Sequence, residues 1–426
     1  MKTDILIAGS GCSALYCAIN LPKDKKITVI TKTTLTESDS FLAQGGICVK
    51  RDDNDFDSFF DDTLKAGHFE NNKESVEIMI NSSRDVINDL IGFGVEFNKA
   101  GDGSLDYTRE AAHSRSRILY HKDITGKEIT SKLLSYAKSF KNITFMENTV
   151  LFDIIENDGE CVGAVVKRSD GKIDTVSCGY TVLATGGIGG LFRHSTNYRH
   201  LTGDAIAIAL KHNVKLKDID YIQIHPTTFY NKNENDRSFL ISESVRGEGA
   251  KLLNKKMERF VDELLPRDLL SEAINEQLRK DGTNFVWEDL RTIPKDELIS
   301  HFPNIIKHCR ENGYDVFNEC IPVVPAQHYF MGGIEVDTYS RTSMKRLFAI
   351  GETACNGVHG KNRLASNSLL ESLVFAKRAA LDIADKNLTI KELPDIDLSQ
   401  YTDTKELSNR YKKAILDEIQ RRKHNV

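Results

Sequence analysis

The chain has 426 residues, of which 28% are charged, and a formal net charge of −5. Because one hydrophobic core usually stops growing below this length, we expect more than one domain. The mild acidity offers no basic footprint, so we expect no nucleic-acid partner. The start, Met1-Lys2-Thr3-Asp4, does not resemble a signal segment, and no uncharged apolar run reaches about 18 residues. We therefore expect a cytoplasmic protein without membrane contact.

The eight cysteines are scattered along the chain, and none belongs to a C-x-x-C pair. This spacing indicates neither a disulfide framework nor a zinc or iron–sulfur site. We expect reduced, mostly buried thiols and no metal.

A strand, a glycine turn, a helix and a second strand open the chain. Residues 4–8 form a short apolar run, residues 9–11 the turn, residues 12–20 a small-residue helix, and residues 27–30 are again β-branched. This order over about 30 residues is the βαβ unit that opens a dinucleotide-binding sheet. The acidic residue usual after the second strand is missing, since Thr31-Lys32 stands there, and this argues against a plain NAD enzyme.

Further elements are expected along the rest of the chain. Apolar residues at three- and four-residue spacing predict helices over 57–67 and 74–91. Strands are predicted over 149–155, 161–166 and 180–184, with hairpin turns at 157–159 and 170–171. The charge-rich stretch 219–325 predicts an inserted domain. A strand at 347–350, an amphipathic helix over 368–386, and a charged end over 405–426, as a surface helix or a frayed tail, complete the chain.

Several glycine-containing segments point to a cofactor. Residues 9–14, Gly-Ser-Gly-Cys-Ser-Ala, match G-x-G-x-x-A, whose glycines let a pyrophosphate sit at a helix N-terminus. Alone, this motif also fits an ordinary turn. Together with the segments at 40–46, 184–187, 203–205, 351–352 and 362–371, it resembles in order and spacing the motifs of the succinate dehydrogenase/fumarate reductase flavoproteins. The resemblance covers residues 2–386.

This resemblance implies an α/β fold in which a Rossmann-like FAD-binding domain carries an inserted α+β capping domain. The FAD-binding domain would comprise residues 1–218 and 330–386, the capping domain 219–329, and a short charged tail 387–426. Membrane-bound members attach the flavin to a histidine, but Asp39 stands at that position, so non-covalent FAD is expected. The residues implied in FAD binding are Gly9, Ser10, Gly11, Cys12, Ser13, Lys32, Ser40, Phe41, Leu42, Ala43, Gln44, Gly45, Gly46, Asp204, Glu352, Ser368 and Leu369.

Histidines and arginines spread over about 140 residues would meet in one pocket, as the resemblance implies. Two imidazoles and two guanidiniums suit a C4 dicarboxylate, whose ends need separate anchoring. The substrate-binding residues implied are His225, Ser242, Glu243, His328 and Arg363. Arg267 would move a proton at the substrate, with Glu243, Arg246 or Glu248 relaying charge to it, because an arginine pKa above about 12 makes it an unusual acid or base.

One segment distinguishes the branches of the family. Residues 108–119, Thr-Arg-Glu-Ala-Ala-His-Ser-Arg-Ser-Arg-Ile-Leu, resemble T-R-E-x-x-H-S-x-x-R-I-L of the members that oxidise L-aspartate, which the succinate enzymes lack. This implies oxidation of L-aspartate to iminoaspartate with dioxygen or fumarate as acceptor, the first step of NAD synthesis by the quinolinate route. Glu110 would then be a catalytic-site acid that recognises the substrate ammonium, and iminoaspartate would pass to quinolinate synthase.

Two alternatives remain open. A soluble fumarate reductase of the same family fits most motifs, although the sequence holds no C-x-x-C-H haem site to bring electrons to the flavin. A non-catalytic or tRNA-modifying FAD protein would leave the joint presence of His225, Arg267, His328 and Arg363 unexplained. The tail after Glu371 is shorter than the helical bundle typical of the aspartate-oxidising members, so the role of that bundle is in doubt here.

Overall fold

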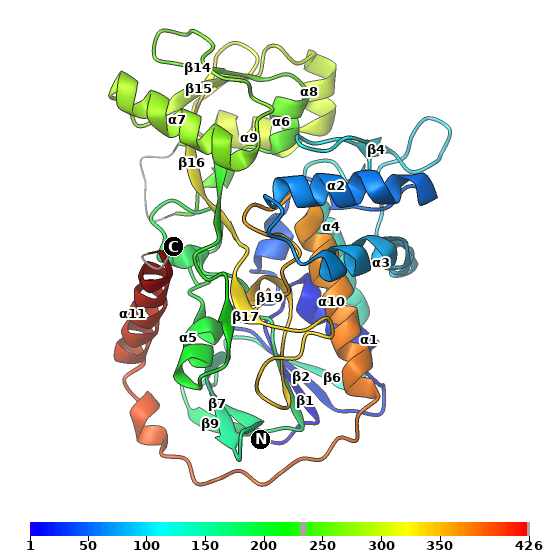
Figure 1. Cartoon of the computed structure of the whole chain (residues 1–426), viewed down its shortest axis with the longest axis vertical. Coiled ribbons are helices and arrows are strands. Elements are labelled where there is room, and N and C mark those ends of the chain that lie inside the picture. Colours follow the sequence, from blue (N-terminus) through cyan, green and yellow to red (C-terminus); the bar gives the residue numbers. More distant parts are fainter. Residues whose placement is uncertain (231–235, 424–426) are drawn as a thin grey trace.

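The computed structural model describes residues 1–230 and 236–423 and contains a parallel five-stranded sheet, which lies in the lower half of the molecule in Figure 1. The strand order is β18-β10-β1-β2-β6, and every neighbouring pair is parallel. The strands are β1 Ile5–Ala8, β2 Ile27–Ile30, β6 Ile143–Met146, β10 Tyr180–Leu183 and β18 Leu347–Ala349. All residues of β1, β2 and β10 are buried, as expected for strands covered on both faces.

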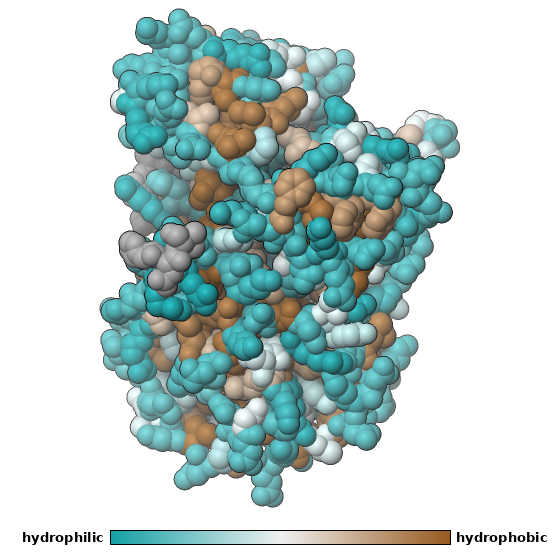
Figure 2. Space-filling model, viewed as in Figure 1, coloured by the Kyte–Doolittle hydropathy of each residue, from teal (hydrophilic) through white to brown (hydrophobic). Residues whose placement is uncertain are grey.

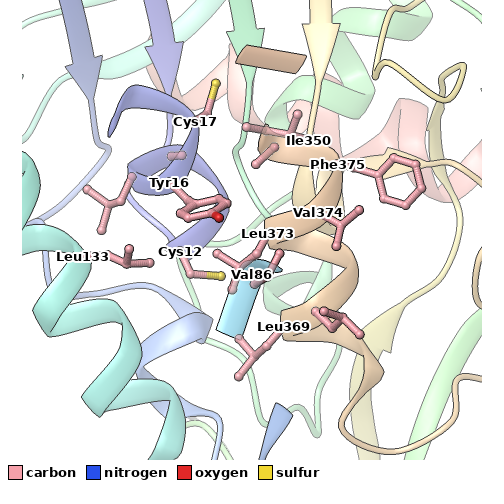
Figure 3. Close-up of a cluster of buried hydrophobic side chains, with 14 of the residues drawn as sticks. Cys12, Tyr16, Cys17, Val86, Leu133, Ile350, Leu369, Leu373, Val374 and Phe375 are labelled. Carbon is pink, nitrogen blue, oxygen red and sulfur yellow. The ribbon is translucent and has the colours of Figure 1, made fainter. Parts of the chain in front are cut away.

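Helices cover one face of this sheet and build the main core. They are α1 Cys12–Asn20, α3 Lys73–Gly92, α4 Thr125–Lys138 and α10 Asn367–Ala384. Figure 3 shows Tyr16 of α1, Val86 of α3, Leu133 of α4 and Leu373 of α10 converging in one cluster. Because α10 lies against both α1 and α3, most of its residues are buried. The helix predicted over 368–386 is confirmed as α10.

A second layer lies on the other side of the sheet. The antiparallel strands β7 Val150–Asn157, β8 Glu160–Lys167 and β9 Ile173–Ser177 pack there with α5 Asp204–Lys211. The predicted hairpin turn is confirmed, since Asp158 and Gly159 join β7 to β8 with φ angles of 52° and 74°. The charged end forms helix α11, Thr404–Lys423, whose Ile415 and Ile419 pack into this layer. Residues 424–426 lie outside the described residues.

The stretch after residue 218 builds a unit with a core of its own. Its sheet has the order β13-β12-β16-β15-β14 and carries a separate cluster of buried apolar side chains. The strands are β12 Ile222–Phe229, β13 Phe239–Leu240, β14 Lys251–Leu253, β15 Val286–Asp289 and β16 Ile321–Phe330, and the helices are α6 Glu243–Gly247, α7 Arg267–Asp281, α8 Lys295–His301 and α9 Pro303–Glu311. We call this unit the cap; β12 and β16 connect it to the sheet domain (Figure 1).

The remaining elements are short except for helix α2. They are α2 Phe56–Ala66, β3 Ile47–Cys48, β4 Tyr107–Thr108, β5 Ile118–Leu119, β11 Leu216–Lys217, β17 Gly333–Glu335, β19 Ala354–Cys355, and 3-10 turns at Asp39–Leu42, Asp53–Asp55, Gly189–Leu191, Gly351–Thr353 and Leu398–Tyr401. Helices α2 and α3 confirm the two helices predicted over 57–67 and 74–91. Hydrophilic residues cover most of the face seen in Figure 2, with apolar patches scattered among them. No helix within residues 1–230 and 236–423 is long and apolar enough to cross a membrane.

The turn after β1 allows a sharp prediction about the cofactor. Gly9 has φ +128°, and a Cβ built on it would overlap the carbonyl oxygen of Ala184. Gly9→Ala should therefore open the turn that faces the expected pyrophosphate, and the purified protein should lack flavin absorbance. Gly171→Ala is the control, because Gly171 has φ +83° but nothing within 4 Å of the added carbon. Flavin bound at the parent level in Gly9→Ala would contradict the prediction.

Candidate active site

One long pocket brings the predicted residues of both groups together. It begins at the carboxyl ends of β1 and β2 and reaches the cap. Of the residues expected to bind FAD, only Phe41 does not line it, because its ring packs against the main core. All the residues expected around the substrate line the same pocket: Glu110, His225, Ser242, Glu243, Arg267, His328 and Arg363.

At the end of the pocket near β2, an acid from another segment takes the place of the acidic residue that the sequence lacks after the second strand. The ammonium of Lys32, just after β2, donates to Asp204 Oδ2 at 2.8 Å and to Thr202 Oγ1 at 2.9 Å. Asp204 begins α5, directly after Gly203 with its φ of 71°. An acid is thus present beside the second strand, but it comes from a distant segment. Thr202 was not predicted, and no motif distinguished it from an ordinary turn residue.

The middle of the pocket fits a large cofactor with many polar atoms. Ser38 Oγ, Asp39 Oδ2 and Gln44 Oε1 are buried there without a hydrogen-bond partner among the described residues. Burial raises the pKa of Asp39 to about 7, and that of Glu352 to about 8. A Cβ on Gly45 would come within 2.6 Å of Glu110 Oε1, so the backbone itself forms the wall. Unsatisfied polar atoms along a glycine wall are what a flavin dinucleotide would need.

Two buried arginines meet at the cap end of the pocket. Arg267, the first residue of α7, donates from Nε to Glu243 Oε2 at 2.6 Å. Gln223 Oε1 accepts from Arg267 Nη1 at 2.9 Å and from Arg363 Nε at 3.2 Å. Arg363 also donates to Ser368 Oγ at 2.7 Å. Gln223 was missed from sequence, although its place on β12 two residues before His225 puts both side chains on one face.

The surroundings of the two histidines favour their neutral forms, so the two imidazoles and two guanidiniums expected to meet here do not form a cluster of four cations. Their rings lie 5.1 Å apart, edge to face. Burial, and then the charge of Arg267, hold the pKa of His225 and of His328 well below the ordinary value. His328 Nδ1 is 2.7 Å from Thr196 Oγ1, whereas His225 Nε2 has no partner among the described residues. The positive charge of the site therefore resides on its arginines.

Glu110 places a carboxylate in the same pocket. Its Oε1 accepts from Ser244 Oγ at 3.1 Å and its Oε2 from Ser366 Oγ at 2.6 Å. The residue is 5% exposed. Burial, and then the neighbouring Glu243 carboxylate, raise its pKa. Such an acid holds its proton more readily than usual unless a cation comes to lie beside it.

The candidate relay from Arg267 leads into the cap. Arg246 lies 3.7 Å from the carboxylate of Glu243 and is fully buried. Glu248, in contrast, is turned toward His301 at 3.0 Å and does not line the pocket, so it is not placed beside Arg267. Glu288 of β15 was not predicted. Its side chain is buried without a hydrogen-bond partner among the described residues, and it interacts electrostatically with Arg246.

The comparisons with known proteins first define a class. The family model described as FAD binding domain matches residues 4–369, so the chain belongs to that class of flavoproteins. It also resembles a solved structure of E. coli quinol fumarate reductase with TM-score 0.85 and 28% identity, over 99% of this chain and 74% of that chain. A structure of quinol-fumarate reductase with menaquinol molecules gives TM-score 0.87 and 29% identity, over 97% and 76%.

Sequence relatives define the branch. The chain is 49% identical to L-aspartate oxidase of Clostridium perfringens, over 99% of this chain and 95% of that protein. It is 50% identical to L-aspartate oxidase of Clostridium acetobutylicum, over 90% and 88%. The chain belongs to the L-aspartate oxidase family. These findings confirm the predictions of the family, the α/β fold, the FAD cofactor and an FAD-dependent oxidoreductase. Relatives differ in length, since the chain spans 70% of the Nostoc sp. protein, which is 41% identical.

The buried acid in the cap predicts a pH effect on stability. Burial raises the pKa of Glu288 to about 8, whereas the pKa of a glutamate in the unfolded chain is about 4.3. Between these values the unfolded chain has lost a proton that the folded chain keeps, so stability falls as pH rises. Glu288→Gln removes this loss and should raise Tm more at pH 8 than at pH 5. Thermal unfolding of the holoenzyme checks this, with the exposed Glu258→Gln as control; an equal change at both pH values would contradict it.

Proposed function

We propose that the protein oxidises L-aspartate to iminoaspartate with non-covalently bound FAD, using dioxygen or fumarate as the electron acceptor. The observation that carries this proposal is the carboxylate of Glu110 in the same pocket as Arg267 and Arg363. A C4 dicarboxylate needs the arginines, and only a substrate with an added ammonium needs the acid. Asp39, at the position of the flavin-linking histidine in other members, offers no imidazole for a covalent bond.

The residues of the proposed substrate site would have separate roles in substrate binding and in proton transfer. Arg363, with the imidazoles of His225 and His328 and the hydroxyl of Ser242, would hold the two carboxylates. Glu110 would accept hydrogen bonds from the substrate ammonium. Arg267, held by Glu243 at 2.6 Å, would stabilise and move charge at the reacting carbons. The flavin, when bound, supplies the acceptor for the hydride that leaves the substrate Cα.

The same site also supports a second candidate, a soluble fumarate reductase. The observation in its favour is the likeness to quinol fumarate reductase structures, at 28% and 29% identity. Only the ammonium contact by Glu110 separates the two candidates chemically. Under the first candidate function, the oxidation of L-aspartate would be the first step of NAD synthesis by the quinolinate route, and quinolinate synthase would consume the iminoaspartate.

Arg267→Lys tests the role of the guanidinium. A lysine keeps the positive charge, but its single ammonium cannot reproduce the planar guanidinium that donates to Glu243 and to Gln223 together. We expect kcat for aspartate oxidation to fall by about 100-fold or more, the loss typical of one preorganised donor, while flavin absorbance stays at the parent level. Arg279→Lys, an exposed position on the same helix, is the control. A rate near that of the parent enzyme would show that Arg267 has another role.

Glu110→Gln separates the two candidate functions. The amide keeps the size but loses the charge that would compensate the ammonium, at a cost of about 2–5 kcal/mol. At about 1.4 kcal/mol per tenfold, kcat/KM for aspartate should fall by about 30-fold to a few thousandfold. Fumarate reduction with chemically reduced flavin should persist, because fumarate carries no ammonium. Glu248→Gln, paired with His301 outside the pocket, is the matched control.

Each outcome of the Glu110 experiment is informative. A loss confined to aspartate supports the oxidase. Equal losses in both reactions would make Glu110 a generally catalytic or structural residue. No loss in either reaction would remove the observation on which the aspartate proposal depends and leave fumarate reduction as the better description.

A further inference from the structure

A buried arginine lies behind the segment that carries Glu110. The side chain of Arg117 is completely buried, next to β5, and it does not line the pocket. It donates to Asp55 Oδ1 at 3.0 Å, to Asp62 Oδ2 at 2.6 Å and to Ser58 Oγ at 2.9 Å. These three partners lie on or just before α2. A cation with two carboxylates at such distances is a rigid anchor, because breaking one contact would leave a charge unpaired in the interior.

The anchor is connected to the turn that follows Glu110. Ser114 donates to Asp62 Oδ2 from both its backbone N–H and its hydroxyl, each at 2.7 Å. The turn between Glu110 and Ser114 includes Ala112 with φ 64°. A non-glycine residue adopts this left-handed conformation only when its surroundings impose it. Asp62 therefore fixes one side of the turn, and Glu110 projects from the other side into the pocket.

His113 connects the same arginine to the opposite wall. Its Nδ1 is 3.1 Å from Arg117 Nη1, and since a guanidinium has no acceptor, Nδ1 must accept. The proton of the ring is then on Nε2, which donates to the carbonyl of Ala365 at 3.0 Å. Burial lowers the pKa of His113 to about 4, so the ring remains neutral and this arrangement is kept.

The wall held by His113 carries two groups of the proposed substrate site. Ala365 lies between Arg363, which lines the pocket, and Ser366, whose hydroxyl donates to Glu110 Oε2 at 2.6 Å. One imidazole thus joins the Glu110 segment to the segment of a carboxylate-binding arginine. The separation of these two groups must match the separation of the ammonium and a carboxylate in one substrate, a match that tolerates little displacement.

We propose that Arg117 and His113 are positioning residues that fix the Glu110 carboxylate relative to Arg363 and so set the preference for a substrate with an ammonium beside its carboxylate. This inference rests on the proposed function. It also explains why the segment 108–119 contains a histidine and an arginine four residues apart. Neither touches the substrate: they act through the placement of Glu110. A purely structural anchor would instead affect every reaction of the site alike.

The experiment is a double-mutant cycle between Arg117→Met and Glu110→Gln, measured with aspartate oxidation and with fumarate reduction by chemically reduced holoenzyme. Alone, Arg117→Met should lower kcat/KM for aspartate at least tenfold, mainly through KM, and change fumarate reduction less than threefold. In the Glu110→Gln background the same substitution should have almost no further effect on aspartate, since the group it positions has lost its charge. Arg115→Met, an exposed residue of the same segment, is the matched control.

Each result decides the question. Equal losses for both substrates, or losses that multiply in the double variant, would overturn the positioning role and leave Arg117 as a structural anchor. If Arg117→Met does not fold, Ser114→Ala removes the hydroxyl contacts to Asp62 and to Arg117 and keeps the backbone contact to Asp62. This variant should show the same selectivity and coupling to a smaller extent, and an unselective loss there would likewise overturn the proposal. If Glu110→Gln itself leaves aspartate turnover intact, the proposed function fails, which is a different result from an absence of coupling.

Discussion

Burial of Arg267 and Arg363 at one place is the constraint on which the pocket depends. Two guanidiniums out of water repel each other unless polar partners lie close by. Glu243 supplies one such partner at 2.6 Å, and the side-chain amide oxygen of Gln223 accepts from both arginines. Arg267 and Glu243 come from the cap, whereas Arg363 precedes α10 of the sheet domain. The site is complete only where the cap meets the sheet, so the long strands β12 and β16 are functional elements as well as connections.

The charges around this pair suit more than one substrate. Arg246, Arg267 and Arg363 carry three positive charges, and Glu110 and Glu243, when ionised, carry two negative ones. One positive charge remains, which an aspartate anion would balance. Fumarate has two negative charges and no ammonium, and it would be balanced if Glu110 kept a proton, which its raised pKa favours. One carboxyl group could thus adjust the charge of the site to either member of a reacting pair.

Local chemistry was predictable from the sequence, and tertiary contacts were not. The roles of the turn at Gly9 and of the residues around the arginines could be predicted from residue types and their order, and the structure brings these residues into one pocket. Phe41 was predicted from its neighbours in a motif, but in the 3-10 turn Asp39–Leu42 its ring packs against the core and not into the pocket. Gln223 and Thr196 gave no signal, because a single amide or hydroxyl becomes important only through what it meets after folding. The charge of the histidines likewise depends on burial, which the sequence does not state.

The neutral imidazoles of His225 and His328 have a consequence for ligand affinity. An anionic ligand beside them would favour their protonated forms, so its binding is linked to the uptake of protons from the solvent. By the reciprocity of linked equilibria, affinity for a dicarboxylate then weakens as the solution becomes more alkaline, even though the arginines keep their charge. The heat released on binding would include the ionisation heat of the buffer. A site that looks permanently cationic in sequence would behave, in a calorimeter, as one that acquires part of its charge together with its ligand.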